Sequence, residues 1–170
     1  MVLLAISKCP MTTQRSNPAL ESEVSANRTL LESIQQDPRT KFSYASDPNA
    51  DGAASVGASA LALLALVKHV GSGGDGANHT AARSLGDFLL AQQTPDGGFL
   101  SHFDPGAGRP VKRLAEVNFP GQAILALVRL YELDGKKDAR LLDAARKGAR
   151  RLVAAQRKAI EEGLAKGAKG

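Results

Sequence analysis

The pattern of hydrophobic positions predicts helices along most of the chain. Residues 53–70 and 119–134 are apolar on nearly all sides, which is typical of helices that are buried among other helices. Residues 138–157 are instead amphipathic, because small or apolar residues recur every third or fourth position, at Leu141, Ala145, Gly148, Leu152 and Ala155. The pattern therefore predicts inner helices at 53–70 and 119–134 and an outer helix at 138–157.

An internal repeat links these helices into a series. Residues 57–71 align without gaps on residues 121–135, at an offset of 64, and several leucines and alanines of the two segments coincide. We expect the matched Leu63 and Leu127 to be buried. The matched glycines, Gly71 and Gly135, stand where a residue in the left-handed conformation commonly ends a helix. The outer helices that follow also match, since Ala-Ala-Arg at 81–83 corresponds to Ala-Ala-Arg at 144–146. A partial third copy lies upstream and predicts an outer helix at 20–36. Repetition at this period indicates stacked antiparallel helix hairpins of about sixty residues each.

The link at residues 94–119 is long for a connection between helices. Turn residues at 95–98 and 104–108 flank a weakly alternating segment that contains Phe99 and Phe103. We predict a short β-hairpin or an ordered loop here, anchored by burial of the two phenylalanines. Residues 37–51 are its counterpart in the preceding repeat.

The outer helix before this link carries a recognisable motif. An aromatic residue at Phe88, a glutamine at Gln93 and Gly-Gly-Phe at 97–99 resemble the repeat of terpenoid cyclases and protein prenyltransferases, with Phe99 where those proteins have Trp. Residues 118–135 resemble the helix pairs of six-hairpin carbohydrate-active enzymes. The resemblance implies an all-α fold, an array of antiparallel α/α hairpins that forms part of an α/α toroid. The chain supplies about two and a half of the hairpins such a ring needs.

The chain departs from the chemistry of several toroid enzymes. It has no Asp-x-Asp-Asp motif, with which some terpenoid cyclases protonate their substrates. Its one cysteine, Cys9, precedes the repeats, so the zinc ligands of prenyltransferases and lanthionine-forming cyclases have no counterpart. The three histidines, at 69, 79 and 102, show no spacing typical of metal ligands. We therefore expect neither a cofactor nor a metal.

Toroid enzymes bind ligands among the inner helices, past the loops that join one hairpin to the next, so the resemblance directs attention to residues 94–119. His102, Asp104 and Glu116 are the candidate catalytic residues, because two carboxylates near a histidine can perform general acid–base chemistry. Asp104 has a structural alternative, since it precedes a proline in a turn and Asp47 repeats that pattern. Neither a turn nor a helix cap requires His102 or Glu116.

The net charge of +5 is concentrated near the C-terminus, where residues 136–170 hold eleven Lys or Arg and four Asp or Glu. This region contains no aromatic residue, which argues against nucleic-acid binding because bases stack on aromatic rings. No apolar stretch reaches the roughly 20 residues of a membrane span, since polar residues interrupt the nearest one, at 53–70. The single cysteine is consistent with a reducing compartment. We expect a soluble, cytoplasmic protein.

The expected organisation is an N-terminal extension at 1–19, a repeat domain at 20–157 and a basic, frayed tail at 158–170. The leading functional hypothesis is a toroid-type enzyme, or a fragment of one, that acts on a carbohydrate or isoprenoid-like substrate. The alternative is a non-enzymatic helical-repeat scaffold that binds a partner protein. An incomplete ring exposes apolar flanks, so we also expect self-association through the terminal helices.

Overall fold

A computed structural model describes residues 32–37, 39, 41–46, 53–73, 76–111 and 119–167. The helices of these regions are α2 (Val56–Gly71), α3 (Gly76–Ala91), α4 (Phe119–Leu133) and α5 (Ala139–Gly167). The strands are β1 (Ile34–Gln36), β2 (Ser43–Ala45), β3 (Ala54–Ser55), β4 (His102–Asp104) and β5 (Arg109–Val111). The N-terminal extension and most of the helix predicted at 20–36 lie outside the described residues.

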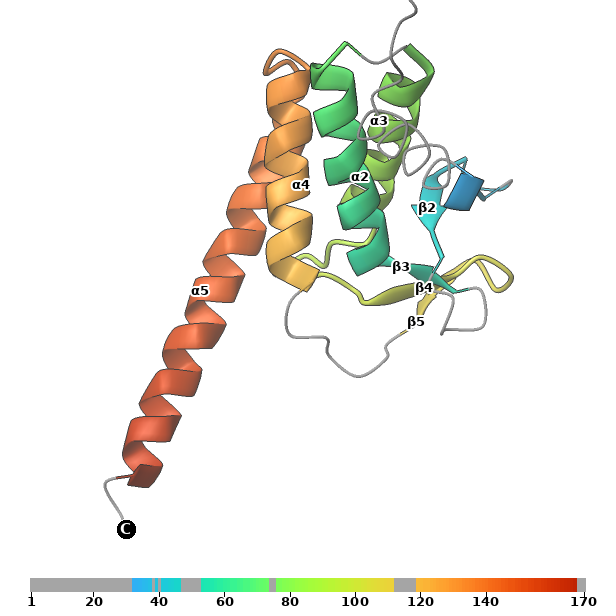
Figure 1. The fold of residues 1–170 in the computed structure, drawn as a ribbon. Helices are drawn as coiled ribbons and strands as arrows, with labels where there is room; N and C mark the ends of the chain where they lie inside the picture. Colours follow the sequence, from blue (N-terminus) through green and yellow to red (C-terminus); the bar gives the residue numbers. More distant parts are fainter. Residues whose placement is uncertain are drawn as a thin grey trace, which may run out of the picture.

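The helices form two consecutive hairpins, as the repeat predicts. Helices α2 and α4 stand side by side, α3 packs against α2, and α5 packs against α4 (Figure 1). The inner helix predicted from residue 53 begins three residues later, because Ser55 caps it: the Ser55 Oγ accepts a hydrogen bond from the Ala58 N–H at 3.2 Å. Residues 54 and 55 instead form β3.

Short antiparallel sheets lie beside the loop ends of the hairpins, so the fold is not purely all-α. Strands β3, β4 and β5 form one sheet, and the predicted hairpin is confirmed by the pairing of β4 with β5. Strands β1 and β2 form the other. The prediction of helix through residue 36 is wrong at its end, because β1 turns back on β2: Asp37 N–H donates to the Phe42 carbonyl at 2.9 Å. The pairing with β2 satisfies backbone groups that a longer helix would have satisfied internally.

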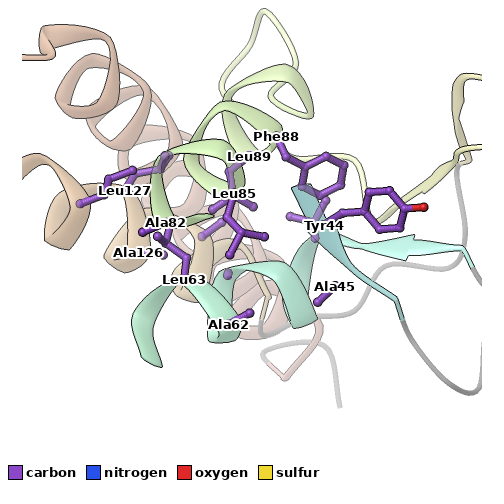
Figure 2. Close-up of a cluster of buried hydrophobic side chains, with 14 of the residues drawn as sticks. Tyr44, Ala45, Ala62, Leu63, Ala82, Leu85, Phe88, Leu89, Ala126 and Leu127 are labelled. Carbon is purple, nitrogen blue, oxygen red and sulfur yellow. The ribbon is translucent and has the colours of Figure 1, made fainter. Parts of the chain in front are cut away.

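The core lies between the helices and extends to the strands (Figure 2). Leu63 and Leu127, which occupy matched positions in the repeat, are both fully buried, as predicted. At the strand end, the Phe88 ring lies 6.1 Å from that of Tyr44 and 6.2 Å from that of Phe103. Each buried Leu or Phe contributes about 1.5–3 kcal/mol, so this continuous cluster holds the strands to the helices.

The turns that end the inner helices follow the glycine pattern in one repeat only. Gly135 has φ 65°, the left-handed conformation predicted for it, and Lys136 follows with φ 64° in a tight turn. The same prediction is wrong for Gly71, which is the last residue of α2, and Gly73 with φ 98° takes the left-handed position instead. The looser Ser-Gly-Gly link allows α2 to run further before the chain turns.

Helix α5 continues past its predicted end at residue 157 and reaches Gly167. Residues 158–162 consist of Lys, Ala, Ile and Glu, and most of these have good helix propensity. Lys158 and Glu162, four residues apart, form an ion pair at 3.8 Å that supports this last part of the helix. None of the helices in the described regions is long and apolar enough to cross a membrane.

Candidate functional site

Two of the three predicted candidate residues, His102 and Asp104, lie at the loop end of the hairpins. His102 lies in β4, with Ser55 of β3 on one side and Val111 of β5 on the other, and only 3% of its surface is exposed. The Val56 N–H donates to the Ser101 carbonyl at 3.0 Å, which fixes the start of β4 at the start of α2. His102 is therefore enclosed in the sheet beside the N-terminus of an inner helix.

Asp104 is partly buried at the end of β4. Its Oδ1 accepts a hydrogen bond from the Ala107 N–H at 2.9 Å, as an aspartate that begins a turn commonly does. A Cβ atom on Gly106 would lie 3.1 Å from the same oxygen, so the turn favours a glycine there. Asp104 Oδ1 thus stabilises the turn. A catalytic role for the residue stays a prediction.

The loops of two successive repeats contact one another through Arg39. Its Nη2 donates to the Pro105 carbonyl at 2.6 Å and also to the Gly106 carbonyl. The Arg39 backbone N–H donates to Asp37 Oδ1 at 2.9 Å, and Asp37 is 1% exposed. A buried aspartate and an arginine therefore join the β1–β2 turn to the β4–β5 turn, and the two loops form one connected rim.

Tyr44 lies between this rim and the core. Burial, followed by the negative charge of Asp37, raises the pKa of Tyr44 above its usual value. Its hydroxyl donates to Gln35 Oε1 at 3.2 Å while its ring packs on Phe88. With a raised pKa, the phenol stays protonated at neutral pH and acts as a hydrogen-bond donor.

The loop contains a second acidic residue, Asp96, which contacts the outer helix α5. Its Oδ2 pairs with Arg151 Nε of α5 at 3.0 Å. The Thr94 hydroxyl, which donates to Oδ1 at 2.5 Å, lowers the Asp96 pKa, as do the Gly98 N–H and Arg151. Asp96 thus joins the loop to the outer helix. The third candidate catalytic residue, Glu116, lies outside the described residues.

A charged cluster at the opposite end of the bundle was not predicted. The Asp134 carboxylate, only 2% exposed, lies 3.1 Å from His79 Nε2 and 3.1 Å from Arg83 Nη2. It joins the end of α4 to the first half of α3. The repeat contains a signal for it, because Asp134 aligns with the apolar Val70 at the offset of 64, and an acid that replaces an apolar residue needs partners when buried.

The inner helices share an exposed face. Leu61 of α2 and Leu125 of α4 occupy matched repeat positions and are 53% and 47% exposed. One turn further, Ala65 corresponds to Arg129, whose Nη1 pairs with Glu132 at 2.9 Å. This α2–α4 face is apolar towards the loop end and charged towards the other. Among the described residues, no three His, Cys, Asp or Glu side chains gather as a metal site requires.

Comparison with known proteins gives a match of fold. No family model matches the chain, and no curated protein matches it significantly. Among solved structures, it is similar to unsaturated glucuronyl hydrolase from Bacillus sp. GL1, which is responsible for the degradation of glycosaminoglycan, with a TM-score of 0.62 and 18% sequence identity. The match covers 83% of this chain and 40% of that protein, which is a six-hairpin α/α toroid. The chain thus has the fold of part of such a toroid and spans less than half of its length.

Proposed function

We propose that this chain is part of a toroid-type enzyme that acts on a carbohydrate, and that the ligand binds where the α2–α4 face meets the β4–β5 hairpin. The observation that carries the proposal is the fold similarity to a glycosaminoglycan-degrading hydrolase over 83% of the chain. Since the chain spans 40% of that protein, we expect it to supply one part of a ligand site.

The chemistry proposed for the site rests on two carboxylates. Glycoside cleavage commonly uses one carboxyl group as an acid and a second as a base or nucleophile. Asp104 and Glu116 are proposed for these tasks, with Asp104 acting through Oδ2 because its Oδ1 accepts from the turn. His102 is enclosed by the sheet, so we assign it a positioning role for β4.

Binding is a sharper test than turnover for a partial toroid. Titration of the chain with a glycosaminoglycan oligosaccharide, followed by calorimetry or NMR, should show saturable binding. Asp104→Asn and Glu116→Gln should weaken it about tenfold, the equivalent of about one charged hydrogen bond. Asp143→Asn is the matched control, because Asp143 is an exposed acid on the outer helix α5 and is not one of the proposed site residues.

Unchanged oligosaccharide binding by these variants would contradict the proposal. If the variants fold with unchanged circular dichroism and bind every oligosaccharide as the parent chain does, Asp104 and Glu116 are not site residues. Tighter binding of a prenyl diphosphate than of any sugar would favour an isoprenoid substrate instead.

A scaffold is the second candidate function, supported by the exposed Leu61 and Leu125. Two large apolar side chains on adjacent helices are a suitable contact for a partner protein. A double Leu61→Asp, Leu125→Asp variant separates the two hypotheses. Loss of a co-purifying protein without any change in sugar binding would favour the scaffold, whereas loss of sugar binding would favour the enzyme.

A further inference from the structure

The turn between β4 and β5 receives an arginine from the preceding repeat. Residues 105–108 form this turn, and the carbonyl groups of Pro105 and Gly106 both accept hydrogen bonds from Arg39 Nη2. The contact with the Pro105 carbonyl measures 2.6 Å. Because the guanidinium is charged, these hydrogen bonds are stronger than those between neutral groups. Arg39 therefore stabilises a turn that lies 66 and 67 positions further along the chain.

The backbone of Arg39 is itself fixed in the β1–β2 turn. Its N–H donates to Asp37 Oδ1 at 2.9 Å, and Asp37 is buried. The Lys41 N–H donates to the Asp37 carbonyl at 2.7 Å, and the Asp37 N–H donates to the Phe42 carbonyl at 2.9 Å, which closes the turn. With its backbone already ordered, Arg39 loses only side-chain entropy when it contacts the β4–β5 turn.

Gly108, the last residue of the β4–β5 turn, leaves room for the arginine. A Cβ atom on Gly108 would lie 3.2 Å from Arg39 Nη1, which is closer than an ordinary van der Waals contact. Gly108 also has φ 63°, a left-handed conformation that glycine adopts most readily. The turn thus presents backbone to the guanidinium on both sides, through two carbonyl groups and a glycine.

The same turn orients the Asp104 carboxylate. Its Oδ1 accepts from the Ala107 N–H at 2.9 Å, and Pro105 and Gly106 are the two residues between them. We propose that Arg39 is a positioning residue: by binding these two carbonyl groups it keeps Oδ1 on Ala107 and leaves Oδ2 in one orientation for a ligand. The inference rests on the proposed function, in which Asp104 acts through Oδ2. One repeat then orients the carboxylate of the next.

NMR of the Ala107 amide tests the positioning without any ligand. Protonation of Asp104 weakens the hydrogen bond to this amide, so acidification should move its signal in the parent chain. Arg39→Gln should reduce that movement and speed hydrogen exchange of the Ala107 amide about tenfold. Lys41→Gln is the matched control, because Lys41 is exposed in the same β1–β2 turn and contributes its backbone to it. An Ala107 amide that behaves alike in the parent and Arg39→Gln would overturn the proposal, whether or not a sugar binds.

A double-mutant cycle with a glycosaminoglycan oligosaccharide completes the test. Arg39→Gln should weaken binding by up to about tenfold, as Asp104→Asn does, and the two changes together should weaken it no further. This non-additivity is expected because Arg39 acts through Asp104. A combined loss of about a hundredfold would overturn the proposal, since Arg39 would then act independently of Asp104. If the parent chain binds no sugar but Arg39→Gln alters the Ala107 amide as expected, the proposed function fails and the positioning of Asp104 by Arg39 stands.

Discussion

The two halves of α5 form one continuous helix but have opposite surroundings. In the first half, Leu141, Ala145 and Gly148 are buried against α4 and the loop that contains Phe99. In the second half, Leu152 and Ala155 continue the same stripe, but Leu152 is only partly buried and Ala155 is exposed. The difference shows that an apolar stripe predicts where a helix can pack, whereas the length of the neighbouring helix decides how much of the stripe is covered.

The largest expected effect compares two leucines of α4, the helix on which α5 packs. Leu127 is fully buried and Leu125 is 47% exposed. Leu127→Ala should lower the free energy of unfolding by about 2–5 kcal/mol, because it removes buried methyl groups and leaves a cavity. Leu125→Ala should change it by less than about 0.5 kcal/mol. Urea unfolding of both variants measures the contrast, and equal effects would mean that α4 is not an inner helix of the core.

Alanine substitution of one glycine in each half of α5 tests the contrast between the two halves directly. A Cβ atom on Gly148 would lie 2.9 Å from Ile124 Cγ1 and 3.0 Å from Phe99 Cε2, whereas nothing lies within 4 Å of one on Gly163. Gly148→Ala should therefore destabilise the protein by about 1–3 kcal/mol through overpacking. Gly163→Ala should increase helicity, since alanine is favoured over glycine by about 1 kcal/mol in a helix. Thermal unfolding monitored by circular dichroism would show opposite shifts, and a stabilising Gly148→Ala would contradict the close approach.

A smaller effect is expected where the first half of α5 begins. Asp138 Oδ1 accepts from the Arg140 N–H at 3.1 Å and caps the helix, so Asp138→Ala should cost about 1 kcal/mol. The side-chain hydrogen bond from Arg140, the largest cause, lowers the pKa of Asp138. A lowered folded-state pKa means that the contribution is present above the unfolded value, near 4, and is lost as the pH falls through the folded value. The free energy of unfolding should therefore fall more between neutral and acidic pH in the parent chain than in Asp138→Asn. The asparagine keeps a hydrogen-bond acceptor but does not titrate.

The smallest effect is expected at the last contact before α5 leaves the bundle. The Arg151–Asp96 pair is exposed on both sides, and such pairs contribute about 0–1 kcal/mol and weaken with salt. Arg151→Gln should therefore change the unfolding midpoint slightly at low salt and not at high salt. A larger, salt-independent loss would mean that the pair holds the loop in place more firmly than its exposure indicates.

The candidate site could be predicted from the sequence only in part. Its position in the loop between hairpins followed from the resemblance to toroid enzymes, and the structure places His102 and Asp104 together in one strand. The link through Arg39 to the preceding loop could not be predicted, because it joins residues 66 and 67 positions apart through side-chain geometry alone. The Asp134 cluster was likewise missed, although its departure from the apolar Val70 of the other repeat is visible in the sequence.

The sequence by itself determined the repeat, the inner and outer helices and the burial of Leu63 and Leu127, because helical periodicity and apolar composition are local properties. Only the tertiary structure decided that residues 34–36 and 54–55 are strands. Their backbone groups can hydrogen-bond within a helix or across a sheet, and the choice depends on partners distant in the chain. It also decided which half of α5 is covered, since packing ends where α4 ends.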